Sequence, residues 1–103
     1  MYNLTSLSLE SNNFTGSIPS SISNLIQLQK LAVGSNQLIG SIPEWIGNLK
    51  CLYILYLDDN YFTGTIPSSM TTLSNLTYLF LEYNYLNGTI PDGIGNLTSL
   101  KNI

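Results

Sequence analysis

Residues 52–70, LYILYLDDNYFTGTIPSSM, decide the fold, because most of the apolar and turn-forming residues in this stretch recur 24 positions earlier and 24 positions later. The repeat runs without an insertion from residue 4 to residue 99. A fixed period of this length predicts a solenoid, in which each turn contacts only its neighbours. We therefore predict one domain, residues 1–103, with turns at 4–27, 28–51, 52–75 and 76–99 and a partial fifth turn at 100–103. The columns that hold the same residue in every full turn include those of asparagine and proline: Asn12, Asn36, Asn60 and Asn84, and Pro19, Pro43, Pro67 and Pro91.

Each turn begins with a pattern typical of a half-buried strand. In the third turn Leu55 and Leu57 alternate with residues expected to be exposed, and the other turns show the same period of two. Strands that repeat at one phase predict a parallel sheet. Asn60 follows Leu57 by three residues, where its amide can bond backbone groups of its own and the adjacent turn. A large apolar residue comes next in each turn and is predicted to point to the core: Phe14, Leu38, Phe62 and Leu86.

The second half of each turn predicts a short extended segment followed by a tight helix. Gly64 marks a position that needs unusual backbone angles or a close approach. The Ile-Pro pair that follows suits an extended edge segment, because proline cannot donate a backbone hydrogen bond. Met70, Leu73 and Leu76 then recur at a spacing of three, which matches a 3₁₀ helix.

These features combine into the pattern LxxLxLxxNxFTGSIPxxIxxL at residues 4–25, which closely resembles the plant-type leucine-rich repeat. The resemblance covers the whole chain. It implies an α/β solenoid, a right-handed superhelix with a parallel sheet on the concave face and short 3₁₀ helices on the convex face. This chain departs from the family in that we expect no caps, because paired cysteines are absent. The repeat is found in ectodomains of plant receptor-like kinases and receptor-like proteins and in polygalacturonase inhibitors. The resemblance therefore implies a non-enzymatic recognition module, outside the cell or at its surface.

The composition is acidic and poor in charged residues. The net charge is −3, the only cations are three lysines, and the chain has no arginine or histidine. Nucleic acid is therefore not an expected partner, since phosphate binding needs clustered Lys and Arg. Cys51 is the only cysteine, which excludes an intrachain disulfide and a multi-cysteine metal site. We expect no cofactor and no membrane insertion, because no apolar run approaches the length of a membrane span, and we find no signal peptide.

The columns that differ between turns hold the candidate binding residues. On the strand face, turns one and two present small polar groups, whereas turns three and four present aromatic side chains around acids. Tyrosine gives a large, rigid contact area at low entropic cost, so this patch predicts a site for a basic or amide-rich peptide segment or protein loop. The alternative is that these aromatic residues only stabilise an exposed sheet. The predicted binding residues are Tyr56, Asp58, Asp59, Tyr61, Tyr78, Phe80, Glu82, Tyr83 and Tyr85.

Asp58 and Glu82 share a column on adjacent strands, and their proximity is expected to raise the pKa of one carboxyl. Paired carboxylates can serve glycoside hydrolysis or bind a cation. No histidine or second catalytic set accompanies them, so we predict no catalytic residue and no metal site. Cys51 likewise lacks a histidine to activate it as a nucleophile. Trp45 is expected to lie flat on the helical side.

Apolar columns are predicted to be uncovered at both ends of the solenoid, because the sequence shows no polar capping turn. One interpretation is that the chain is a fragment of a longer protein. The alternative is a self-assembling structural protein, in which copies stack head to tail into filaments. The predicted self-association residues are Leu4, Leu7, Leu9, Phe14, Leu86, Ile90, Ile94, Leu97, Leu100 and Ile103.

Two further surface features carry alternatives. A row of small hydroxyl side chains, interrupted by Ile39, follows one edge, and plant-type repeats are adapted for ice binding in some proteins that this chain resembles. Five Asn-x-Thr sequons would accept glycans in a secreted chain. They lie at Asn3, Asn13, Asn75, Asn87 and Asn96.

Overall fold

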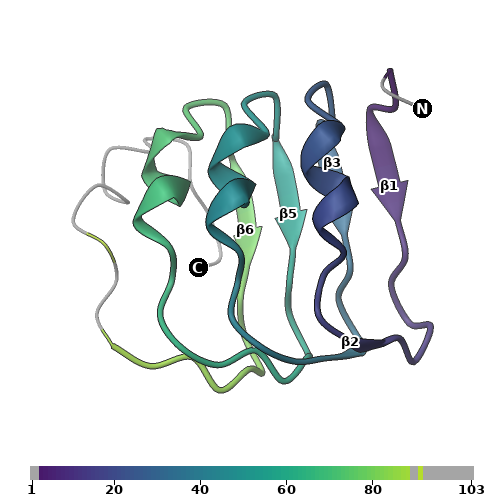
Figure 1. Ribbon diagram of the computed structural model, residues 1–103, viewed down its shortest axis with the longest axis vertical. Helices are drawn as coiled ribbons and strands as arrows, with labels where there is room; N and C mark the ends of the chain where they lie inside the picture. The colour runs from purple at the N-terminus through teal and green to yellow at the C-terminus, as the bar shows by residue number, and fades with distance from the viewer. Residues whose placement is uncertain (1–2, 89–90, 92–103) are drawn as a thin grey trace.

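Four parallel strands form one sheet in the computed structural model, which describes residues 3–88 and residue 91 (Figure 1). They are β1 (Ser6–Ser8), β3 (Lys30–Ala32), β5 (Ile54–Tyr56) and β6 (Tyr78–Phe80), and they pair in that order. Lys30 is the partner of Ile54 across the sheet, and Ile54 is the partner of Tyr78. The register therefore equals the repeat period, and the predicted parallel sheet is confirmed.

A second, smaller sheet is formed by segments that follow the strands of the first sheet along the chain. It pairs β2 (Thr15–Gly16) with β4 (Gln37–Leu38) in parallel, and an isolated bridge between Ser41 and Thr63 continues it. Thr15 is the partner of Gln37, so this register is two residues short of the repeat period. The backbone of Gly64 has φ +78°, in the left-handed region that favours glycine, which explains the glycine column.

In the described part of the chain, three short 3₁₀ helices cover the side of the sheet nearer the viewer in Figure 1. They are η1 (Ser20–Asn24), η2 (Glu44–Asn48) and η3 (Ser68–Thr72), and each directly follows a proline with an extended backbone. In η3 the N–H of Leu73 donates to the carbonyl of Met70, which is the i+3 bond that the sequence spacing predicts. Trp45 of η2 is partly buried and packs against the core, on the helix side as expected.

The core lies between the sheet and these helices. Leu55, Phe62 and Met70 are fully buried in the third turn, which has a neighbour on each side. Phe14 was predicted to point to the core and also to lie at an uncovered end of the solenoid; 45% of its surface is exposed, because it belongs to the first turn and one side of it is uncovered. Leu86 is partly buried and packs against the core cluster. Burial therefore depends on the position of a turn in the stack.

The asparagine column bonds each turn to the one before it. Asn60 is 4% exposed, and its Oδ1 accepts a hydrogen bond from the N–H of Leu38 at 3.0 Å. Its Nδ2 donates to the carbonyls of Val33 and Asp58, both at 3.1 Å. Asn36 repeats the arrangement with the first turn, as the sequence predicts. This ladder fixes the bend at which each strand ends.

Candidate binding surface

Two aromatic rings stack on the exposed face of the sheet. Tyr56 of β5 and Phe80 of β6 are partners across the strands, and their rings are nearly parallel, 3° apart in orientation with centroids 4.5 Å apart. The Nζ of Lys30 lies 5.9 Å from the centroid of the Tyr56 ring. The stack forms an apolar wall beside the small side chains of β1 and β3.

A second aromatic contact lies at the start of the same strands. The rings of Tyr53 and Tyr78 meet edge to face, with centroids 5.6 Å apart and an interplanar angle of 80°. Tyr53 was not among the predicted binding residues, because it precedes the strand and falls outside its alternating pattern. Its position directly before Ile54 was the feature of the sequence that could have indicated its place beside the strand face.

Three more tyrosines occupy the rim where the strands end. Tyr61 and Tyr85 are stacked with centroids 5.9 Å apart and an interplanar angle of 8°, and Tyr83 is 79% exposed. Asp59 and Tyr83 have left-handed backbones, with φ of 56° and 62°. These four residues line a common hollow of about 360 Å³ above the asparagine column. We call this surface the tyrosine rim.

A separate hollow of about 240 Å³ lies on the strand face, over Gly34. It is lined by Lys30, the first residue of β3, and Tyr56, the last residue of β5, and by Glu10 and Asp58, which follow β1 and β5. The predicted binding residues therefore divide between two hollows, because Asp58 lines this one and its neighbour Asp59 lines the hollow of the tyrosine rim.

Asp58 has the most unusual environment of the acids on this face. Its Oδ1 is buried without a hydrogen-bond partner among the described residues. Burial raises the pKa of Asp58 above its ordinary value of 3.8, and the nearby charges of Glu82, Asp59 and Glu10 raise it further, whereas a hydrogen bond with its own backbone lowers it. The predicted effect of Glu82 on this pKa is present but smaller than that of burial.

Among residues 3–88 and 91, no three His, Cys, Asp or Glu side chains lie close enough together to hold a metal ion. Cys51 is an exposed free thiol. The described part of the chain also contains no helix with the length and hydrophobicity that a membrane crossing requires.

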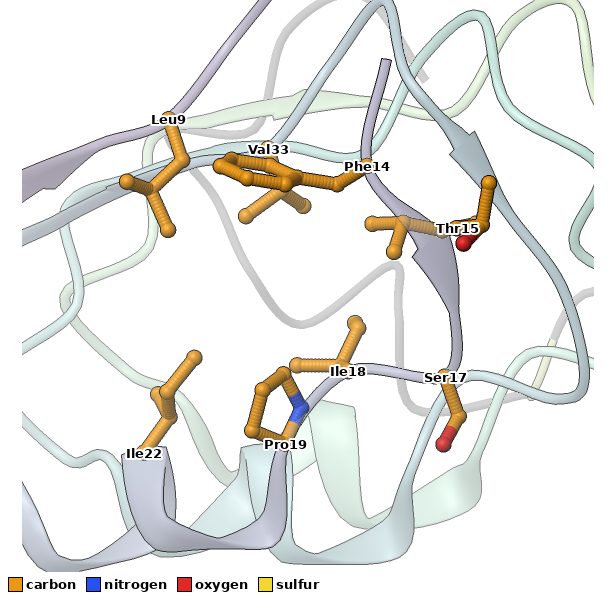
Figure 2. Close-up of a pocket in the computed structure, with 9 residues that line it drawn as sticks. Leu9, Phe14, Thr15, Ser17, Ile18, Pro19, Ile22 and Val33 are labelled. Carbon is orange, nitrogen blue, oxygen red and sulfur yellow. The ribbon is translucent and has the colours of Figure 1, made fainter. Parts of the chain in front are cut away.

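An apolar hollow of about 280 Å³ opens at the first turn (Figure 2). Leu9, Phe14 and Val33 extend into it from one side, and Ile18 and Ile22 approach from the other. Leu4, Leu7 and Leu86 are partly buried against the core. The other predicted self-association residues lie outside the described residues: Ile90, Ile94, Leu97, Leu100 and Ile103.

The sequons and the hydroxyl row are on the surface. Asn3, Asn13, Asn75 and Asn87 are exposed, and Asn96 lies outside the described residues. The hydroxyl row is exposed as well, at Thr15, Ser17, Thr63 and Thr65, and Ile39, which interrupts the row, is also exposed.

Comparison with known proteins identifies the repeat. The sequence model described as a leucine-rich repeat region matches residues 4–103. Among curated proteins no sequence match was found.

Solved structures of plant proteins superimpose closely on the chain. The leucine-rich-repeat ectodomain of the membrane receptor kinase GASSHO1/SCHENGEN3 from Arabidopsis thaliana, in complex with CASPARIAN STRIP INTEGRITY FACTOR 2, has a TM-score of 0.94 and 44% identity over 97% of this chain. The Arabidopsis receptor kinase HAESA, in complex with the peptide hormone IDA and the co-receptor SERK1, gives 0.93 and 39% over 99%. A plant ice-binding protein gives 0.88 and 40% over 91%. The chain spans 12%, 17% and 31% of the lengths of these three proteins.

Proposed function

Because this chain belongs to the leucine-rich repeat proteins, we propose that its strand face and tyrosine rim bind a peptide or protein ligand without catalysing a reaction. We place the chain outside the cell, as part of a receptor-like or inhibitor-like protein. Two of the similar structures support this proposal, since one is a receptor ectodomain bound to CASPARIAN STRIP INTEGRITY FACTOR 2 and the other is a receptor kinase bound to a peptide hormone.

The observation that carries the proposal is the unequal distribution of aromatic side chains. The third and fourth turns present two stacked pairs, Tyr56 with Phe80 and Tyr61 with Tyr85, whereas the matching positions of the first turn hold Ser8 and Asn13. The fold does not require aromatic residues at these positions, because the first two turns form the same sheet without them. Exposed aromatic residues beside carboxylates suit a ligand that carries both apolar and hydrogen-bond-donating groups.

The competing explanation is that the rings only stabilise the sheet. Cross-strand aromatic pairs contribute roughly 0.2 to 1 kcal/mol each, so Tyr56 and Phe80 have a structural role in either case. Tyr83 and Tyr85 are different, since they are 79% and 63% exposed. Side chains this exposed gain little from folding, which leaves them available for a ligand.

The test is selection of random linear peptides on the immobilised chain. We expect peptides selected on the wild type to be lost on a variant carrying Tyr56→Ser, Tyr78→Ser and Phe80→Ser. Ile26→Ser is the control, because Ile26 is an apolar residue of similar exposure, 60%, outside the face.

A second variant covers the risk that the triple substitution unfolds the chain. Tyr83→Ser combined with Tyr85→Ser changes only exposed residues, and it too should weaken peptide capture. If both variants remain folded by circular dichroism and keep every selected peptide, the proposal is wrong.

A second candidate function is end-to-end association of copies. The apolar hollow at the first turn favours it, because Phe14 remains 45% exposed there (Figure 2). Sedimentation over a concentration series tests this candidate. Species that grow with concentration and revert to monomer in a Leu9→Glu variant would support it, and a constant mass of 11.4 kDa would exclude it.

A further inference from the structure

We infer that the hollow over Gly34 is a subsite for one cationic side chain, lysine or arginine, of the bound peptide. This inference rests on the proposed function, because it assumes that the strand face binds peptides. It goes further by naming the residue class that the face selects.

Gly34 is the reason that the hollow exists. Its column reads Glu10, Gly34, Asp58 and Glu82, so the second turn lacks the side chain that the other turns carry at this position. A Cβ at Gly34 would lie 2.5 Å from Oδ1 of Asp58, so a side chain at this position would require the Asp58 carboxyl to move. The Asp58 carboxyl therefore occupies part of the space that a residue at position 34 would fill, and the remainder is open.

The lining of the hollow suits the two parts of a basic side chain. The ring of Tyr56 gives the hollow an apolar lining for an aliphatic stem. The carboxylates of Glu10 and Asp58, with the hydroxyls of Ser11 and Ser35, offer acceptors where the strands end. Asp58 is partly buried, so a charged donor that reaches its carboxylate gains more here than at an exposed carboxylate.

Lys30 sets the orientation of the guest. Its ammonium lies over the Tyr56 ring, on the side of the hollow that these two residues line. It repels a second cation from that side, so the charged end of the guest should lie toward Glu10 and Asp58. A guest carboxylate would be attracted by Lys30 but would face both acids. Replacing Lys30 with a neutral residue should therefore strengthen the binding of a cationic guest and weaken the binding of a carboxylate guest.

The experiment is an NMR titration of the folded chain with N-acetyl-arginine amide, alongside the neutral, nearly isosteric N-acetyl-citrulline amide. We expect saturable shifts of the Gly34 and Asp58 amide signals with the arginine probe and not with the citrulline probe. Asp58→Asn should weaken binding about 10-fold or more, as expected for the loss of a charge-assisted hydrogen bond. Lys30→Gln should strengthen it roughly 2- to 5-fold by removing a like charge.

The control for overall charge is Lys50→Gln, because Lys50 bonds Thr72 Oγ1 away from the hollow, and it should leave binding unchanged. The subsite is refuted if Lys30→Gln weakens binding of the arginine probe, or if the two probes bind equally well. This titration uses no selected peptide, so failure of the subsite is distinguishable from failure of the proposed function. Peptides that still require the aromatic face but show no preference for Lys or Arg would exclude the subsite alone.

Discussion

Replacing Asn60 with alanine should destabilise the chain far more than the same change at Asn12, although both residues occupy the same column. Asn60 is buried and bonds the second turn to the third. The side chain of Asn12 donates only to carbonyls of its own turn, those of Leu9 and Glu10. The comparison separates the contribution of the bonds between turns from the local propensity of asparagine for a bend.

The expected magnitude follows from the groups that lose a partner in Asn60→Ala. The carbonyls that Asn60 contacts keep other donors, since Asn36 also donates to Val33 and the N–H of Ser35 also donates to Asp58. The N–H of Leu38 loses the acceptor that Asn60 Oδ1 provides. One orphaned buried donor costs about 1 to 3 kcal/mol, and the lost amide bonds of Asn60 add about 1 kcal/mol, so we expect about 2 to 4 kcal/mol.

Urea unfolding monitored by circular dichroism measures this difference. In Asn12→Ala no backbone donor is orphaned, so the free energy of unfolding should fall by less than about 1 kcal/mol. Equal losses in the two variants would refute the argument, because they would show that the bonds between turns contribute nothing beyond the bend itself. A loss confined to Asn12→Ala would be still harder to reconcile with the ladder.

Three further predictions use other features of the fold. The variant Asp58→Asn should be more stable than wild type at neutral pH and equally stable in acid. The raised pKa of the folded Asp58 carboxyl means that wild-type stability is lost as pH rises through that pKa. Urea unfolding midpoints measured across pH check this. Tyr83→Asn should raise the free energy of unfolding by about 0.5 to 1 kcal/mol, since asparagine adopts a left-handed backbone more readily than tyrosine does, and thermal melting reports it. Phe62→Ala should cost about 3 to 5 kcal/mol and Phe14→Ala less than half of that, because only Phe62 is fully buried; matching losses in urea would contradict the dependence of burial on turn position.

The columns that serve the stack could be predicted from the sequence. The columns that contain Leu55, Asn60 and Met70 have the same role in each turn. The period-2 and period-3 spacings identify the strand and the 3₁₀ helix without further information. The local pattern of Phe14 is the same as that of Phe62, and its exposure was predicted only from its place at an uncovered end of the solenoid. Only the presence or absence of a neighbouring turn distinguishes the two.

The candidate site was predicted less completely. Sequence spacing placed Asp58 and Asp59 in a single patch, whereas the structure puts them in separate hollows. Asp59, unlike Asp58, has a left-handed backbone where the two side chains separate. The sequence does not indicate this conformation, because serine, aspartate and tyrosine all occupy the column of Asp59. The hollow over Gly34 was also missed, since an absent side chain leaves no motif.

Two features that oppose folding lie close to the proposed binding surface. Burial of Asp58 disfavours the ionised carboxylate at neutral pH, and Tyr83 holds a backbone conformation that bulky residues seldom adopt. The fold requires neither residue, because the first two turns place Ser11 and Ser35 in the column of Tyr83, and Gly34 in the column of Asp58. Unfavourable residues that the fold does not need are characteristic of surfaces selected for another purpose. Their position beside the two hollows is therefore an argument for binding that is independent of the aromatic composition.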